Sequence, residues 1–193
     1  KLKTFAKVVL GKMLCSESKQ GYTYEYYLKS KNIQWLSVDT TSVEKMYFSD
    51  SEKNLYKIQK DDLLVSEGGE VGKTCIWQDE LTECYLQNSV HKVTFDRNYN
   101  PRYFLYLFFV YGKVGGFDSS VSRVSIAHLT WDILVNIKFI VPPLDEQRQI
   151  AGFLDSKCEK IDKAIALIQR EIESIKEYKT SLIDNAVRGK INV

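Results

Sequence analysis

The C-terminal part of the chain carries its most regular hydrophobic pattern. From Ala151 onward, apolar residues recur at alternating steps of three and four, which is the spacing of a coiled-coil seam. One half of the seam, at heptad position d, consists of Leu154, Ile161, Ile168, Ile175 and Leu182. The other half, at position a, consists of Ala151, Cys158, Ile165, Ile172, Lys179 and Ala186, and only Lys179 breaks the pattern. The pattern predicts one long amphipathic helix.

Residues that start and stop helices bound this segment. Pro142-Pro143 cannot continue a helix backwards, and Asp145 and Glu146 place negative charge at its N-terminal end. Arg188-Gly189 provides a basic last turn and a terminating glycine. A helix over 145–188 would be about 66 Å long, which exceeds the width of a compact domain of this size. We expect an arm whose seam meets a second, similar helix. The alternative is an amphipathic helix folded against its own domain.

The residues before 142 favour short strands with a few helices. Strand-like apolar runs alternate with glycine-rich or polar segments, and residues 102–111 have the composition of a buried helix. The expected strands cover 5–14, 33–38, 63–66, 74–77, 84–95 and 137–141. The predicted fold is therefore α+β, with a mixed-strand domain over 1–141 and one long coiled-coil helix over 142–193.

A glycine-rich turn separates two of these strands. Gly68, Gly69 and Gly72 allow the backbone to turn tightly, so we expect a β-hairpin or a bulge with Lys73 near its tip. The segment superficially resembles a phosphate loop. The spacing G-x-x-x-x-G-K-[ST] fails, however, because Gly68 and Gly69 lie four and three residues before Gly72. We therefore reject nucleotide binding here.

Two polar or aromatic clusters each allow two interpretations. Gln87-Asn88-Ser89 lies within a strand-like run, where such side chains form either an internal polar network or a base-reading face. The tyrosines at 22, 24, 26 and 27 either stack on bases or line the edge of the core. A third segment, 112–124, is rich in glycine and serine and contains the hydrogen-bond donors Ser120, Ser122 and Arg123.

The net charge of the chain is small, but charged residues are unevenly distributed along it. The formal net charge is +2, too small to give the whole protein affinity for nucleic acid. Residues 1–31 carry seven basic and two acidic side chains, whereas residues 44–83 carry five basic and ten acidic ones. A basic face on a balanced domain is compatible with phosphate binding, although many enzymes show comparable asymmetry.

Cysteine usage and hydropathy limit the class of protein. The four cysteines form no C-x-x-C pair and are accompanied by two histidines, so we expect reduced thiols and no metal site. The longest apolar run, 104–111, is too short to cross a bilayer, and the first residues lack the cleavage pattern of a signal peptide. We therefore expect a cytoplasmic protein.

Four stretches together resemble a known family, the DNA-specificity subunits of type I restriction-modification systems. These stretches are 62–73, 87–91, 122–129, and 142–147 with the long helix and its end at 189–191. The resemblance implies a DNA target recognition domain over 1–141, followed by one conserved-region helix. Typical members contain this unit twice, with their two helices antiparallel. This chain contains it once, so it is either a half-length subunit that dimerises, which we favour, or one half of a longer protein.

The resemblance also implies a non-catalytic function. Such subunits read a bipartite target in double-stranded DNA and position methyltransferase subunits, and often restriction subunits, whose cofactors this chain would not bind. The sequence is consistent, because it has no N-P-P-[YF] methylation motif. Lys73 is the candidate for phosphate and Arg123 for guanine. The full candidate set is Lys73, Gln87, Asn88, Ser120, Ser122 and Arg123, with Lys19 and Tyr22 in reserve. The rival function is a coiled-coil protein-interaction adaptor without DNA binding.

Overall fold

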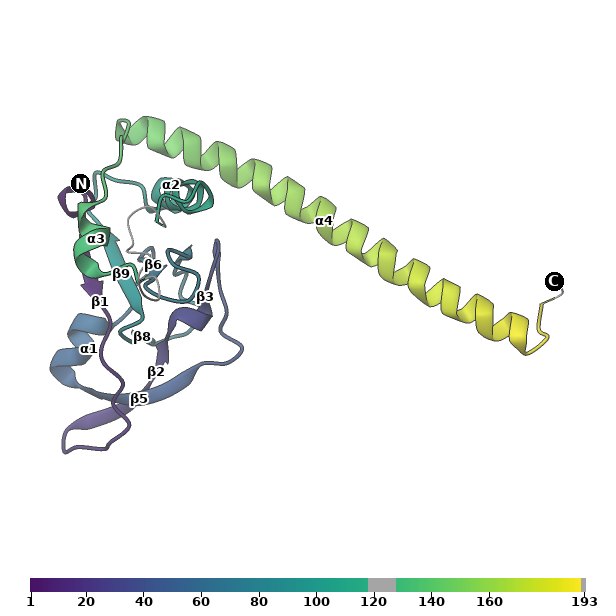
Figure 1. Ribbon diagram of the computed structural model, residues 1–193, viewed down its shortest axis with the longest axis horizontal. Coiled ribbons are helices and arrows are strands. Elements are labelled where there is room, and N and C mark those ends of the chain that lie inside the picture. The colour runs from purple at the N-terminus through teal and green to yellow at the C-terminus, as the bar shows by residue number, and fades with distance from the viewer. Residues whose placement is uncertain (118–127, 192–193) are drawn as a thin grey trace. The chain divides into compact units, whose positions relative to one another are not determined.

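A computed structural model of the chain describes residues 1–117 and 128–191 (Figure 1). The chain divides into two compact units, Lys1–Gln149 and Ile150–Val193. The first unit holds the described strands and short helices, and helix α4 (Leu144–Val187) begins there and continues through the second. The predicted α+β class with a long C-terminal helix is confirmed. The helix begins and ends one residue before its expected bounds.

The first unit is built around a four-stranded antiparallel sheet with the order β1-β9-β6-β7. Its strands are β1 (Ala6–Leu10), β9 (Val90–Phe95), β6 (Leu63–Ser66) and β7 (Thr74–Ile76). At the centre of the sheet, Leu63 of β6 lies opposite Val93 of β9 on one side and Ile76 of β7 on the other. All four residues of β6 are buried. Burial on both faces explains why β6 reads as a continuous apolar run instead of alternating.

Two hydrophobic clusters cover the two faces of this sheet. Successive side chains point to opposite faces of a strand, so β6 contributes Leu63 and Val65 to the first cluster and Leu64 to the second. The first cluster includes residues of α2 (Pro101–Lys113) and α3 (Trp131–Asn136), among them Phe104, Phe108 and Leu134. The second includes Leu28, Ile33, Cys75, Trp77 and Leu86.

A second, three-stranded sheet has the order β5-β2-β8. It consists of β5 (Glu44–Ser49), β2 (Tyr22–Leu28) and β8 (Tyr85–Leu86), with β2 antiparallel to β5 and parallel to β8. Helix α1 (Asp50–Tyr56) follows β5 through a capping box, in which Ser49 Oγ accepts from the Glu52 amide and Glu52 Oε2 accepts from the Ser49 amide. The remaining elements are the short hairpin β3 (Ile33–Gln34) and β4 (Ser37–Val38) and the 3₁₀ turns η1 (Leu2–Thr4) and η2 (Ser30–Asn32).

Several expected strands are wrong in extent, each for a local reason. The strand expected over 5–14 ends at Leu10, because the chain leaves β9 there: the Lys12 amide donates to the Leu86 carbonyl, and the Lys12 carbonyl accepts from the Asn88 amide. The segment 33–38 is a hairpin that turns at Leu36, whose φ is 67°. Residues 84–95 form two strands separated by a turn. Residues 137–141 form no strand, and Ile140 is 96% exposed.

Candidate nucleic-acid interface

The glycine turn between β6 and β7 is the predicted hairpin, but the expectation that Lys73 lies near its tip is wrong, because Lys73 lies at its base. The Ser66 amide donates to the Lys73 carbonyl at 2.8 Å, closing the hairpin. The Lys73 ammonium donates to Gln34 Oε1 at 2.9 Å and pairs with Glu70 at 3.0 Å. Hydrogen bonds from Trp35 and then Lys73 lower the pKa of Glu70. Lys73 is therefore already engaged in the free chain, and its contact with phosphate stays a prediction.

Two residues that precede and follow the candidates Ser120, Ser122 and Arg123 in the sequence contact this same turn. Phe117 packs against Gly72, where a Cβ would lie 2.2 Å from the phenyl ring. On the other flank, the Leu129 amide donates to the Glu67 carbonyl at 2.8 Å. Both Phe117 and Leu129 are buried. The candidates Ser120, Ser122 and Arg123 lie between these anchors, outside the described residues, so their roles stay predictions.

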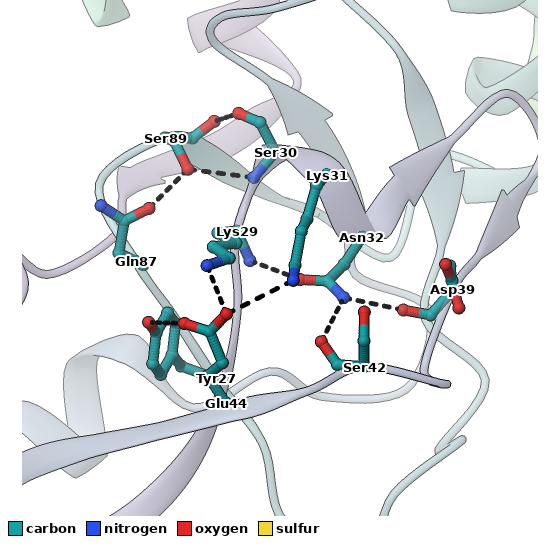
Figure 2. A network of polar contacts seen from close by, with 10 residues as sticks. All are labelled: Tyr27, Lys29, Ser30, Lys31, Asn32, Asp39, Ser42, Glu44, Gln87 and Ser89. Atoms are coloured by element: carbon teal, nitrogen blue, oxygen red, sulfur yellow. Dashed lines mark hydrogen bonds and ion pairs between the residues drawn. The ribbon is translucent and has the colours of Figure 1, made fainter.

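The Gln87-Asn88-Ser89 segment forms a braced turn between β8 and β9 (Figure 2). Ser89 Oγ donates to Gln87 Oε1 at 2.5 Å and accepts from the Ser30 amide at 3.0 Å, while Ser30 Oγ donates to the Ser89 carbonyl at 2.7 Å. Gln87 Nε2 donates to Asn88 Oδ1 at 2.5 Å. These contacts form the internal polar network that was one of the two interpretations. DNA contact by Gln87 and Asn88 stays a prediction.

Part of the basic N-terminal segment is neutralised by the acidic segment that follows it (Figure 2). Glu44 accepts from Lys29 at 2.6 Å, from Tyr27 at 2.9 Å and from Lys31 at 3.3 Å. These hydrogen bonds, with Lys29 first, lower the pKa of Glu44 to about 2. Burial, followed by the bond to Glu44, raises the pKa of Tyr27 to about 12. Lys12 is likewise paired with Glu52 at 2.5 Å. The excess of basic residues in 1–31 is therefore smaller at the surface than in the sequence.

The reserve candidates Lys19 and Tyr22 adjoin a surface that the candidate list largely missed. The Lys19 ammonium lies 5.9 Å from the centre of the Tyr22 ring. The pairing of β2 with β5 puts Tyr22, Tyr24 and Tyr26 on the same face as Lys45 and Tyr47. We call these five residues the tyrosine face. Its signal in the sequence is the period-two alternation of residues 44–49, in which Met46 and Phe48 are buried while Lys45 is exposed.

The start of α4 is fixed to the first unit by a buried glutamine. Gln147 is 1% exposed. Its Oε1 accepts from the Asn100 amide at 2.9 Å and its Nε2 donates to the Pro142 carbonyl at 2.8 Å. Asn100 in turn caps α2, because its Oδ1 accepts from the amides of Arg102 and Tyr103. The Pro142–Gln147 stretch thus has a structural role at the base of the long helix.

The predicted seam of α4 is exposed in the single chain. The exposed fractions of the seam side chains are 58% for Ile161, 47% for Ile165, 55% for Ile168, 45% for Ile172, 66% for Ile175 and 44% for Leu182, and Leu154 is partly exposed. A row of exposed isoleucines along one helix is unusual for a surface that stays in water. The seam is therefore a candidate interface.

The described residues offer little for metal or redox chemistry. The four cysteines are free, with Cys75 and Cys84 buried and Cys15 and Cys158 partly exposed. Burial raises the pKa of the Cys84 thiol to about 12, which leaves it protonated at neutral pH. Within residues 1–117 and 128–191, no cluster of histidine, cysteine or carboxylate side chains is arranged to hold a metal ion. In the same ranges no helix is both long and apolar enough to cross a membrane.

Comparison with known proteins identifies the family. Residues 1–177 match the model of the type I restriction modification DNA specificity domain. The chain is 27% identical over 146 residues to the type I restriction enzyme EcoBI specificity subunit of Escherichia coli, covering 75% of this chain and 30% of that protein. The chain therefore spans less than a third of the length of this relative.

Solved structures share the fold. A chain from a study of complex assembly and conformational transition in the type I R-M system superimposes with a TM-score of 0.72 at 19% identity, covering 99% of this chain and 45% of that chain. The HsdS subunit from Thermoanaerobacter tengcongensis gives 0.61 at 18% identity, with coverages of 99% and 44%. With the family model matching most of its length, the chain belongs to the type I restriction modification DNA specificity domain family.

Proposed function

We propose that this chain is a non-catalytic specificity unit that reads one half of a bipartite target in duplex DNA. Residues 1–141 would form the target recognition domain and residues 142–193 the arm that sets its position. The observation that carries the proposal is the combination of one α+β domain with a 44-residue helix whose apolar seam is exposed, in a chain that the family model matches.

The second part of the proposal is that two copies of the unit pair antiparallel through the α4 seam. Relatives contain more than twice the length of this chain, which fits a functional particle built from two units. Two identical domains related by a two-fold axis meet inverted repeats of the same bases, so the target should be a bipartite palindrome. The helix, about 66 Å long, limits the separation of the half-sites to one or two DNA turns of about 34 Å each.

The partners follow from the same family. Methyltransferase subunits would bind the paired specificity units, and a restriction subunit could join them. This chain would then recognise the DNA sequence, and its partners would carry out the chemical reaction. The proposal requires no cofactor of this chain and places it in the cytoplasm with its DNA. Its own contribution is to hold the partner at a fixed distance from each half-site.

The experiment measures duplex binding by the full chain, with and without its methyltransferase partner, at two salt concentrations. Phosphate contacts release counterions, so affinity should fall steeply as salt rises from about 50 to 200 mM. A map of methylated adenines in cells that carry both proteins should show a palindromic bipartite motif. Absence of duplex binding even with the partner would reject the proposal and favour the coiled-coil adaptor, which needs no DNA.

A further inference from the structure

The tyrosine face is an exposed aromatic surface on one side of the β2–β5 ribbon. Tyr24 lies opposite Tyr47, and Tyr26 lies opposite Lys45. The rings of Tyr24 and Tyr47 are in contact, with their centres 4.7 Å apart, although Tyr24 is 52% exposed and Tyr26 is 43% exposed. The other side of β5 supplies the buried Met46 and Phe48, which pack with Tyr27 and Tyr85. The tyrosines therefore are not needed to fill the core.

The charge on this face is positive and is held in place by the rings. The Lys45 ammonium lies 4.2 Å from the centre of the Tyr26 ring and 6.0 Å from that of Tyr24, a distance at which a cation is attracted to the ring face. Within the described ranges, neither Lys45 nor Lys19 forms an ion pair.

The carboxylates of β2 and β5, Glu25 and Glu44, do not cancel the charge of Lys45, because other lysines engage them. Glu25 points to the opposite side of β2, where it pairs with Lys53 at 2.9 Å. Glu44 is paired with Lys29 and Lys31. At Tyr22 the nearby Lys12 ammonium, 4.9 Å from the ring centre, is already paired with Glu52. The tyrosine face thus presents phenolic hydroxyls and the Lys45 ammonium, and none of its five residues is a carboxylate.

We propose that the tyrosine face binds the sugar-phosphate backbone of duplex DNA, an inference that rests on the proposed function. Tyrosine hydroxyls and lysines are common donors to phosphate oxygens, and such contacts fix the register of a protein on DNA without reading sequence. Tyrosine is enriched and lysine is depleted at protein interfaces, so composition alone does not choose between DNA and a protein partner. The Lys45 ammonium, which has an aromatic ring beside it and no carboxylate paired with it among the described residues, favours phosphate. The face therefore positions the domain, and bases are read elsewhere on it.

The test compares Lys45→Ala and the double variant Tyr24→Phe/Tyr26→Phe with wild type, using the full chain together with its methyltransferase partner. The phenylalanines keep the rings and remove only the hydroxyl donors. Affinity for the target duplex and for an unrelated duplex should each fall about two- to tenfold. Lys45→Ala should also reduce the slope of log affinity against log salt by about one.

Lys60→Ala is the matched control, because it removes one exposed lysine that is not on the tyrosine face, and it should change affinity less than twofold. Equal urea midpoints establish that all variants are folded. Unchanged duplex affinity and salt slope in both face variants would overturn the inference. If the variants instead bound the methyltransferase more weakly, the face would be a protein interface. A loss confined to the target sequence would also contradict backbone binding. A wild-type chain that binds no duplex would reject the proposed function itself.

Discussion

His91 Nε2 lies 2.7 Å from the carbonyl oxygen of Leu129. A carbonyl only accepts, so Nε2 carries the proton in this contact and Nδ1 is left as the unprotonated nitrogen. His91 is fully buried, and its Nδ1 has no hydrogen-bond partner among the described residues. The neutral ring thus ties the Leu129 flank to the centre of the sheet.

Acid should lower the free energy of unfolding, because protonation places a charge on this buried ring. Burial lowers the pKa of His91, so between the usual value of about 6.5 and the lowered one the unfolded chain binds more protons than the folded chain. The contribution of His91 to the free energy of unfolding should therefore be complete above about pH 6.5. It should be lost as the pH falls through the pKa of His91 in the folded chain. Urea unfolding at several pH values measures it. His91→Phe should remove this acid-side loss and cost about 1–3 kcal/mol at neutral pH, because the Leu129 carbonyl loses its donor.

The matched control is His128→Gln, which leaves His91 in place and should retain the acid-side loss. If His91→Phe retained the same dependence on pH as wild type, the titrating group would lie elsewhere.

Gly72 should tolerate no side chain. Its φ is 80°, and a Cβ there would lie 2.2 Å from the Phe117 ring. Gly69 has a similar φ of 75° but open space around it. Gly69→Ala should therefore cost about 1–2 kcal/mol of backbone strain, and Gly72→Ala a further 1–3 kcal/mol or so from overpacking. Denaturant unfolding measures both. Equal costs would show that Phe117 moves away without penalty.

The buried glutamine at the start of α4 should matter far more than its neighbour two residues on. Gln147→Leu leaves the Asn100 amide and the Pro142 carbonyl without their partner, and each unsatisfied buried group costs about 1–3 kcal/mol. Gln149→Leu makes the same chemical change at an exposed position and should change the free energy of unfolding by less than about 0.5 kcal/mol. A comparable loss in both variants would indicate a general effect on the helix.

A charge in the α4 seam should separate the proposed dimer without unfolding the domain. Ile168→Glu or Ile172→Glu would bring like charges together in a desolvated contact, at a cost of several kcal/mol. Sedimentation should show monomers, and the bipartite methylation pattern should be lost. Ser174→Glu, off the seam, is the control and should remain dimeric. A seam variant that is still dimeric, or a wild-type motif with two unrelated halves, would show that α4 pairs with something other than a second copy.

Local sequence signals predicted α4 and the glycine hairpin well, because periodicity, prolines and glycines act within a few residues. The same kind of signal was overlooked for α1, whose Ser49 and Glu52 are spaced as a capping box. The division of 84–95 was harder to predict. It depends on Ser30, which is distant in sequence and braces the turn at Ser89.

The candidate site was predicted less completely than the fold. The position of Lys73 beside glycines predicts a side chain near the tip of the hairpin, yet Gln34 from β3 and Glu70 from the turn itself hold its ammonium. The alternation within each strand indicates which side chains share a side of that strand. It does not give the register of β2 against β5, which groups Tyr24 and Tyr26 with Tyr47 and Lys45.

The double burial of β6 has a consequence for how the first unit loses its structure. Leu63 and Leu64 are neighbours on one strand but belong to different hydrophobic clusters, so neither cluster can come apart without displacing a strand on which the other depends. Local unfolding of one cluster therefore also costs the free energy of disrupting the other. Although its described strands form three separate sheets, this unit should unfold cooperatively, with calorimetric and van't Hoff enthalpies in agreement.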